Sequence, residues 1–408
     1  MKQFIREQVT WPQPFPAAEY ADRRRRVRAA LQAAGLDAIL VTAPANITWL
    51  TGYDMIWYHL KNLTGLLVRA DSDDTVFFDS VAHTTIVSIT PEIREIVYVD
   101  GAAVSGSLDE AIAAIKRAIA DKGLAKGKIG LEMWGYAPHA STMAALADGL
   151  RAGGATVEDH WTLVERQRAV KSPLEVQHVR KAAEIGDAAM AAARDAIRPG
   201  VMETEIEAVI MGTMMKLGGG YPGIRTMLGA GPRSGTHHSP PSRRKVQQGE
   251  LVFVDFCGCY DRYHVNVNRT FSLGKPDPRW TDLMNKAAGC IDAIISKVKL
   301  GDPLSKVDEV AQRYTDEAGI RKYVWWVGGY TQEIAVPPDW CGNYWLSTRY
   351  KDMGDPAIKP GMVFNLENQF DVWDNWPGGS GCAYIESLLV TENGLEVLSK
   401  LPRTLVTV

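Results

Sequence analysis

The sequence has few cysteines and no long apolar run. Its 408 residues include five cysteines, an odd number too small for a disulfide framework, so reduced thiols are expected. The start, MKQFIREQVTWPQPF, lacks the apolar core of a signal peptide, and no segment has the roughly 20 apolar residues of a membrane helix. We therefore predict a cytoplasmic protein that has no membrane partner.

A strong charge of either sign is also missing. Lys and Arg together number 45 and Asp and Glu 48, which gives a formal net charge of −3. This balance does not favour nucleic acid as a partner. The basic run Arg23–Arg26 has no second cluster beside it, so we interpret it as the solvated face of a helix.

Helix and strand patterns alternate in the first part of the chain, to about Asp159. This alternation predicts an N-terminal α/β domain over residues 1–165. At the junction, Ser172, Pro173 and Glu175 have the N-cap, first-turn proline and capping-box acid of a helix start.

The second part begins with two helical patterns and is then rich in strands bounded by glycine and proline turns. A further helix pair is expected around Trp280–Val298 and Leu304–Ala318. Helices and strands that are grouped in this way predict an α+β C-terminal domain over residues 166–408.

One predicted hairpin, VDFCGCYDRYHVNVNRTFSLG at 254–274, has an unusual polar face. Asp255 is on its first strand, and His264, Asn266 and Asn268 occupy alternating positions of the second. Because side chains alternate between the faces of a strand, these three share one face. An acid, an imidazole and two amides on one face of a core hairpin indicate a functional site.

The second part resembles the pita-bread superfamily, which includes creatinase, methionine aminopeptidase and prolidase. The resemblance implies a two-domain subunit, usually a homodimer, whose C-terminal pita-bread domain is a curved antiparallel sheet backed by helices. The matching segments, in family order, are QRAVKSPLEV, GTHHSPPSRRKVQQGELVFVDF, CYDRYHVNVNRTFSLG, IKPGMVFNLEN and YIESLLVTENGLEVLS.

The resemblance also implies a contact across the dimer. In creatinase-like dimers a loop of the N-terminal domain reaches the partner's active site, and its counterpart here is GYDMIWYHLKN. Trp57, Tyr58 and His59 are therefore candidates for substrate binding. A role as interface anchors without catalytic duty fits them equally well.

Metal-using members of the superfamily bind two divalent ions through two aspartates, one histidine and two glutamates. Asp255 stands where the first aspartate does, but Asn266 replaces the second, and no histidine follows His264. Glu367 and Glu386 match the two glutamates. Because a di-metal site needs its full set of ligands, we predict a dismantled metal site and no cofactor.

Three carboxylates gathered in one cleft repel one another, and burying them without partners is costly. In a metal-free site the natural cation is the substrate, through an amidinium, guanidinium or ammonium group. Creatinase, the metal-free relative, acts on a guanidinium compound. The alternative is that the acids pair with Arg233, Arg243 or Arg269.

Two adjacent histidines precede the hairpin. His238 aligns with the histidine that is the general acid/base in creatinase. An imidazole titrates near neutrality, so it can take a proton from water and return it to a leaving nitrogen. We interpret His237 as a structural neighbour.

A narrower resemblance, to the ectoine hydrolase branch, is carried by GCYDRYHVNVNRT, LGKP, PPDW, TWLTGYD and QRAVKSP. That branch also lacks the metal set, and its enzymes hydrolyse a carbon–nitrogen bond of ectoine, a cyclic amidine. It has a longer acid where Asp255 stands and a non-acidic residue where Glu367 stands, so the reaction type transfers better than the substrate. Asn268 falls near a substrate-binding glutamate of creatinase, and His264 near a tyrosine.

Twelve tryptophans are many for this length. Their faces attract organic cations, which makes Trp340 a candidate for substrate binding, although ordinary packing explains any single one as well. Six fall between the motifs of the second part: Trp325, Trp326, Trp340, Trp345, Trp373 and Trp376.

These observations predict a metal-independent hydrolase of a non-peptide carbon–nitrogen bond in a small cationic or zwitterionic compound, with His238, Asp255 and Glu367 as catalytic residues. The alternatives are a metal-dependent Xaa-Pro peptidase with a degenerate site, a lyase acting on a small cationic osmolyte, and a non-catalytic binding protein. The predicted substrate-binding residues are His264, Asn266, Asn268, Glu386, Trp57, Tyr58, His59 and Trp340.

Overall fold

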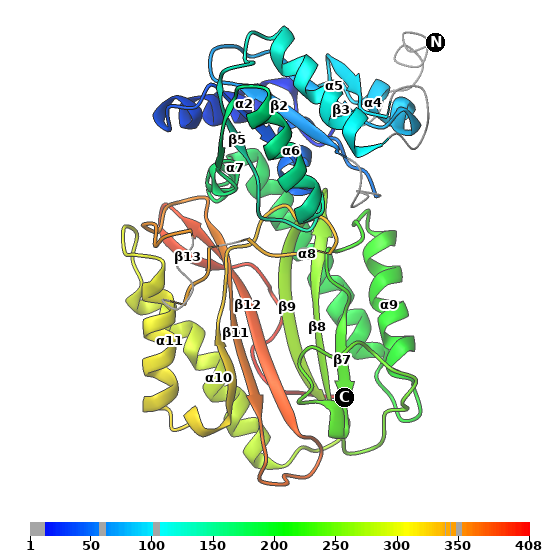
Figure 1. The fold of residues 1–408 in the computed structure, drawn as a ribbon. Helices are drawn as coiled ribbons and strands as arrows, with labels where there is room; N and C mark the ends of the chain where they lie inside the picture. Colours follow the sequence, from blue (N-terminus) through cyan, green and yellow to red (C-terminus); the bar gives the residue numbers. More distant parts are fainter. Residues whose placement is uncertain (1–12, 57–62, 101–106, 339, 343, 348–352) are drawn as a thin grey trace. The chain divides into compact units, whose positions relative to one another are not determined.

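Two units make up the chain, Met1–Arg168 and Ala169–Val408. The computed structural model describes residues 13–56, 63–100, 107–338, 340–342, 344–347 and 353–408 (Figure 1). The domain boundary predicted at residue 165 lies inside the last helix of the first unit, α7 (Thr162–Arg168). No helix within the described ranges is long and apolar enough to cross a membrane.

The N-terminal unit is built on a mixed sheet of six strands in the order β4-β3-β2-β1-β5-β6. Helices α5 and α6 contribute a buried apolar face to the core on this sheet, as the predicted α/β domain requires. The strands are β1 (Ala38–Val41), β2 (Gly65–Arg69), β3 (Thr75–Asp79), β4 (Ile96–Tyr98), β5 (Lys128–Leu131) and β6 (Thr156–Asp159). The helices before α7 are α2 (Ala17–Ala33), α3 (Pro44–Thr51), α4 (Thr84–Ile89), α5 (Leu108–Asp121) and α6 (Ala140–Ala152).

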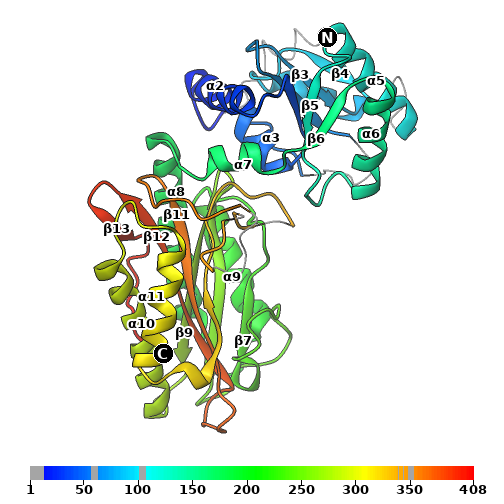
Figure 2. The same cartoon turned by 60° about the vertical axis from the view of Figure 1, so that its left-hand side comes forward.

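The C-terminal unit is built on a curved sheet in which β10, β11, β12, β9, β8 and β7 follow one another in antiparallel order (Figure 1). Figure 2 shows the same sheet after a turn of 60° about the vertical axis. The strands are β7 (Met227–Ala230), β8 (Leu251–Tyr260), β9 (Tyr263–Ser272), β10 (Val324–Gly328), β11 (Val363–Asp371), β12 (Gly381–Thr391), β13 (Gly394–Val397) and β14 (Val406–Thr407). The helices are α8 (Pro173–Ala196), α9 (Glu203–Lys216), α10 (Pro278–Lys297) and α11 (Ser305–Glu317).

Local sequence signals explain where several of these elements begin. Helix α8 begins at the predicted capping box, in which Ser172 accepts a hydrogen bond from the Glu175 N–H and Glu175 accepts one from the Ser172 N–H. Strands β8 and β9 are joined by a two-residue turn at Asp261 and Arg262, both of which have positive φ. Such a turn matches the right-handed twist of a hairpin. The predicted hairpin is therefore confirmed.

The two faces of this sheet have different surroundings. Val254, Phe256 and Val267 pack with side chains of α8 and α9 in one apolar cluster, so we call that side the helix-backed face. A β-carbon on Gly258 would come within 2.2 Å of the Ala182 carbonyl oxygen, so a glycine is required where α8 lies against β8. Because strand side chains alternate, Asp255 and its same-facing neighbours lie on the other side, which we call the inner face.

The fold predicted from the sequence is thus confirmed. The chain has an N-terminal α/β domain and a C-terminal pita-bread domain with a curved antiparallel sheet backed by helices. The inner face of that sheet carries the site residues.

Candidate active site

Strand pairing places four side chains in one row across the inner face. Asp255 on β8 pairs with Asn268 on β9, Asn268 pairs with Ile385 on β12, and Ile385 pairs with Glu367 on β11. Paired residues project from the same face of a sheet. The row therefore contains two carboxylates, one amide and one aliphatic side chain, and all four are buried.

Two asparagines connect the carboxylates of this row. Asn266 donates from Nδ2 to Asp255 Oδ1 at 2.7 Å and accepts at Oδ1 from Asn365 Nδ2 at 3.1 Å. Asn365 Nδ2 also donates to Glu367 Oε1 at 2.9 Å. The chain of contacts runs Asp255–Asn266–Asn365–Glu367, so amide groups connect the two acids. Asn266 is thus at the site, as predicted, and Asn365 is a member that the sequence reasoning missed.

Burial dominates the electrostatics of both acids. It raises the pKa of Asp255 well above its usual range, and the negative charge of Glu367 adds to the effect. Burial also raises the pKa of Glu367 to about 7, although hydrogen bonds from Tyr330 and Asn365 oppose the shift. Desolvation favours the neutral form of a carboxyl group. Near neutral pH the pair therefore retains protons that two exposed acids would have lost.

Tyr330 completes the surroundings of Glu367. Its hydroxyl donates a hydrogen bond to Glu367 Oε1, and Gln369 donates to the other oxygen at 3.2 Å. The Tyr330 ring has edge contacts with Trp340 and Trp345, at centroid distances of 5.0 and 5.2 Å. The predicted candidate Trp340 is therefore one ring away from the carboxylate. Aromatic rings beside a buried acid are typical surroundings for an organic cation.

His264 lies on the inner face, but backbone groups occupy both of its ring nitrogens. Nδ1 donates to the Arg262 carbonyl at 2.7 Å, and Nε2 accepts from the Gly223 N–H at 2.8 Å. Burial lowers its pKa to about 4, so the ring is neutral at pH 7. Its nitrogens are used to hold the turn before β7, and its proposed contact with substrate stays a prediction.

Glu386 faces the opposite side of the sheet, which corrects the expectation that three carboxylates converge. Its partner on β11 is Leu366, one residue before Glu367. Its carboxylate accepts from Arg269 at 2.5 Å and from the Tyr384 hydroxyl at 2.7 Å, and both of these side chains are also buried. The alternative pairing with Arg269, considered from the sequence, is the one found for this acid.

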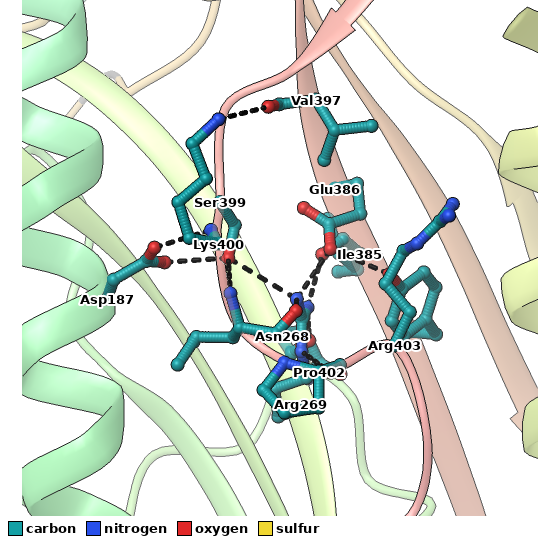
Figure 3. A network of polar contacts seen from close by, with 12 residues as sticks. Asp187, Asn268, Arg269, Ile385, Glu386, Val397, Ser399, Lys400, Pro402 and Arg403 are labelled. Carbon is teal, nitrogen blue, oxygen red and sulfur yellow. Dashed lines mark hydrogen bonds and ion pairs between the residues drawn. The ribbon is translucent and has the colours of Figure 1, made fainter.

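Figure 3 shows how this ion pair is held. Arg269 also donates to the Pro402 carbonyl at 3.0 Å and to the Ser399 hydroxyl at 3.3 Å, while Ser399 donates to Asp187 of α8 at 2.6 Å. The pair thus links β9 and β12 to the C-terminal segment and to a helix. This arrangement gives Glu386 a structural role, and substrate binding by Glu386 finds no support in it.

The register of β12 explains why Glu386 does not face inward with Asp255 and Glu367. Side chains alternate along a strand, so a shift of one residue moves an acid to the other face. The position of β12 that faces inward between Asn268 and Glu367 belongs to Ile385. In this row an isoleucine therefore stands where a second inward glutamate was expected.

Asn268 is buried on the inner face, and neither atom of its amide group has a hydrogen-bond partner among the described residues. A buried polar group without a partner costs about 1–3 kcal/mol. Such a group in a folded protein calls for an explanation, and a ligand is one. The position agrees with the substrate-binding role predicted for Asn268.

The two histidines before the hairpin lie beside Trp325. The His237 ring is fully buried between Phe253 and Trp325, and its Nε2 is 3.2 Å from Asp371 Oδ1. His238 is exposed and meets the edge of Trp325 at a centroid distance of 5.1 Å. Its pKa is lowered by partial burial and by His237, so it is available as a base at neutral pH.

The remaining tryptophans are sorted by their surroundings. Trp376 packs against Trp280 at 4.8 Å, and Trp373 is 83% exposed, so neither belongs to the inner face row. The predicted substrate contacts Trp57, Tyr58 and His59 lie outside the described residues.

Comparison with known proteins agrees with this architecture. A model of the Creatinase/Prolidase N-terminal domain matches residues 23–170. A model of Metallopeptidase family M24 matches residues 177–392, more than half of the chain.

The chain belongs to metallopeptidase family M24.

Its relatives in the family differ in their named activities. An ectoine hydrolase from Halomonas elongata is 28% identical over 411 residues, which cover 96% of this chain and 98% of the relative. A Xaa-Pro dipeptidase from Pyrococcus furiosus is 25% identical over 243 residues, which cover 60% of this chain and 66% of the relative. The family is thus one of hydrolases, and the resemblance to the pita-bread superfamily is confirmed.

Solved structures show the same fold. A prolidase from Thermococcus sibiricus has a TM-score of 0.79 at 20% identity, covering 95% of this chain and 99% of that one. A Xaa-Pro dipeptidase from Bacillus anthracis has a TM-score of 0.77 at 22% identity, covering 95% of this chain and 100% of that one.

The M24 name implies metal ions, and the side chains of the inner face do not fit the five-ligand set of metal-using relatives. Asp255 and Glu367 are present, whereas Asn266 stands where a second aspartate is expected, and Glu386, expected as the second glutamate, faces the other side of the sheet, where Ile385 takes the inward position. The described ranges contain no group of three His, Cys, Asp or Glu side chains that could hold a metal ion. An amide and an aliphatic side chain are poor substitutes for anionic ligands.

Proposed function

We propose that this M24 member hydrolyses a carbon–nitrogen bond, other than a peptide bond, in a small cationic or zwitterionic nitrogen compound without a metal ion. The observation that carries the proposal is the amide-bridged pair of acids, Asp255 and Glu367, on the inner face. The ectoine hydrolase of Halomonas elongata, similar over nearly the whole chain, supports the same class of reaction.

The two acids suit an organic cation because their protons can be exchanged for it. Burial raises the pKa of both acids, so in the absence of another positive charge the pair keeps its protons to a higher pH than exposed acids do. An amidinium or guanidinium group that enters between them supplies that charge and hydrogen-bond donors as well. Binding should therefore displace protons from Asp255 and Glu367, and the nearby rings of Tyr330 and Trp340 favour a cation further.

His238 is the proposed acid/base. Its lowered pKa leaves the ring neutral at pH 7, so it can take a proton from water as the oxygen adds to the carbon. It then returns that proton to the nitrogen that leaves. Asp255 and Glu367 meanwhile accept hydrogen bonds from the N–H groups of the substrate and keep it in the cationic form, whose carbon is more open to attack than that of the neutral form. The water is thus divided between the products, hydroxyl to carbon and hydrogen to nitrogen.

The proposal includes a homodimer in the cytoplasm, in which the loop with Trp57, Tyr58 and His59 lies near the partner's active site. Cross-linking or sedimentation of the purified protein tests the oligomer.

The test of the reaction begins with a thermal-shift screen of ectoine, hydroxyectoine, creatine, guanidino acids, cyclic amides and betaines. A compound bound only by the native state raises the melting temperature by mass action. Each compound that does so is then incubated with protein purified in chelator, and the products are followed by mass spectrometry. Hydrolysis by the chelator-purified wild-type protein that disappears in the Asp255→Asn variant supports the proposal, whereas full turnover by that variant contradicts it.

Xaa-Pro dipeptides provide the competing arm, because the family contains Xaa-Pro dipeptidases. The same protein is assayed against Ala-Pro and Gly-Pro with and without Mn²⁺, Co²⁺ or Zn²⁺. Cleavage that requires stoichiometric metal would establish a metal-dependent peptidase instead.

A further inference from the structure

Residues 231–241, which we call the histidine segment, follow β7 and carry both histidines of the site. A buried carboxylate holds the two ends of this segment. Glu203, the first residue of α9, is fully buried, and its Oε1 accepts from the Ala230 N–H at 2.9 Å. Its Oε2 accepts from the Ser242 N–H at 2.8 Å and from the Ser242 hydroxyl at 2.7 Å. The residues that precede and follow the histidine segment are therefore fixed to one side chain.

Arg233 connects this carboxylate to the far end of the segment. Its Nη1 donates to Glu203, and its Nη2 donates to the Ser239 hydroxyl at 2.5 Å and to the Pro240 carbonyl at 2.8 Å. Glu203 thus sets the orientation of the guanidinium plane, and the plane holds two oxygens of the segment. A planar guanidinium keeps its donors at fixed directions, which a lysine ammonium on its flexible stem does not do.

The backbone of Arg233 contacts the other side of the histidine pair. Its carbonyl accepts from the Thr236 N–H at 3.0 Å and from the Thr236 hydroxyl at 2.6 Å. Thr236 comes directly before His237, and Ser239 comes directly after His238. One arginine therefore brackets the two histidines.

His238 is exposed, so its position depends on the segment that carries it. Its ring meets the edge of Trp325 at a centroid distance of 5.1 Å, and partial burial and His237 lower its pKa. His237 in turn lies 3.2 Å from the Asp371 carboxylate. These neighbours act on His238 only while its ring stays beside them.

We propose that Arg233, oriented by Glu203, is a positioning residue that holds His238 where it can exchange a proton with water and with the leaving nitrogen. The inference rests on the proposed function, which gives His238 this task, and adds the two residues that act through it. An acid/base group must lie within hydrogen-bond reach of the proton that it moves. A displacement of about 1 Å can therefore slow turnover by about 100-fold.

The test variant is Arg233→Lys. Lysine keeps a positive charge beside Glu203, so the variant avoids the large cost of a buried carboxylate without a partner. A single ammonium group does not reproduce the two arms that hold Glu203 and Pro240. Ser239→Ala removes a contact of the bracket and leaves the ion pair in place, so it keeps the test decisive if Arg233→Lys fails to fold.

The matched control is Arg244→Lys. The side chains of Arg244 and Arg233 are both 24% exposed, and Arg244 forms an ion pair with another largely buried acid, Glu250. The hydrogen bonds of the Arg244 side chain go to Glu250 and to the Lys245 carbonyl, outside the histidine segment. This variant should resemble Arg233→Lys in stability and the wild type in the behaviour of His238.

The first measurement needs no substrate. Diethyl pyrocarbonate modifies the neutral form of an imidazole, and tandem mass spectrometry gives the rate of modification of His238 at several pH values. The midpoint of this profile should lie below that of an ordinary imidazole in the wild type and in Arg244→Lys. It should move upward in Arg233→Lys and in Ser239→Ala, because the ring leaves the neighbours that lower its pKa.

The second measurement is the turnover of the compound that the wild type hydrolyses in the thermal-shift screen. In Arg233→Lys, kcat should fall by between about 10-fold and 100-fold, while KM changes by less than about twofold. In Arg244→Lys both constants should stay as in the wild type.

Each other outcome has a definite meaning. A His238 profile that is unchanged in Arg233→Lys and Ser239→Ala overturns the positioning role, because an ion pair that only stabilises the fold lowers the melting temperature alone. An equal shift in Arg244→Lys, or a shifted profile with unchanged kcat, also overturns it. If the wild type hydrolyses none of the screened compounds, the proposed function fails, and the modification profile alone decides whether Arg233 holds His238 in place.

Discussion

The substitution Glu367→Gln tests the buried acid pair through the pH dependence of folding. Burial raises the pKa of Glu367 from 4.5 to about 7 in the folded protein. A group that binds its proton more tightly when folded stabilises the protein most below its unfolded pKa, and this contribution is lost as the pH rises through the folded pKa. The wild type should therefore lose stability between pH 4.5 and pH 7 as Glu367 gives up its proton. The glutamine variant has no proton to lose at this position, so it should not show this loss.

The expected size follows from the shift. At 1.36 kcal/mol per pKa unit, a rise from 4.5 to about 7 corresponds to about 3 kcal/mol of folding free energy. Glutamine keeps the shape of the side chain and an oxygen that can accept from Tyr330 and Asn365. Relative to Glu367→Gln, the free energy of unfolding of the wild type should thus fall by about 3 kcal/mol between pH 4.5 and pH 7.5. Above pH 7.5 the difference between the two proteins should stay constant.

Urea unfolding followed by tryptophan fluorescence at four pH values between 4.5 and 7.5 gives the two free energies, provided that the slope with urea is the same for both proteins. The control is Glu396→Gln, because Arg180 lowers the pKa of Glu396 and so gives a small change of the opposite sign. Parallel curves for wild type and Glu367→Gln would refute the assignment of a raised pKa to Glu367.

Two further predictions concern the proposed site, and a third concerns the ion pair on the helix-backed face. His238→Gln should reduce turnover by a factor of at least about 100 with little effect on the melting temperature, because the residue is exposed and its role is proton transfer; unchanged turnover argues for another base. Tyr330→Phe removes a donor to Glu367, so the pH above which a cationic ligand binds well should move upward in calorimetric titrations; an unmoved profile contradicts the role of that hydroxyl. Glu386→Gln leaves the buried Arg269 charge without its partner and should cost about 3–5 kcal/mol in urea unfolding, while the ligand affinity of the folded protein stays the same; a weakened ligand with intact stability would place Glu386 in the site after all.

Much of the fold follows from local signals in the sequence. The capping box at Ser172 and Glu175 marks the start of α8, and the alternation of polar residues from His264 to Asn268 gives β9 and its inner face. These signals work because they depend on residues three positions apart or on a period of two, which are properties of the chain itself.

The face of Glu386 could not be obtained in this way. An acid next to an isoleucine in YIESLLV has the composition of the family motif, but only the pairing of β12 with β9 and β11 decides which of the two faces inward. Register depends on the partner strands, and a shift of one residue exchanges the faces. The sequence therefore indicated three converging acids where the structure has two.

The partners of the acids were hidden for a related reason. Asn365 and Tyr330 reach Glu367 from β11 itself and from the segment after β10, and nothing in their local sequence marks them as polar contacts. His264 is the opposite case. The alternation along β9 predicted its face correctly, but backbone groups already occupy both of its ring nitrogens. Long-range contacts decide the use of a polar side chain, and a single sequence does not contain them.

The proposed mechanism depends most on the ability of this M24 member to hydrolyse an organic cation without a metal ion. The most direct measurement is the rate of hydrolysis of a compound selected by the thermal-shift screen, using protein with less than about one tenth of a metal ion per chain, in the presence of a chelator. We expect a rate equal to that of untreated protein and no increase when Mn²⁺, Co²⁺ or Zn²⁺ is added. A rate that falls to background in chelator and returns with one of these ions would contradict the metal-independent mechanism.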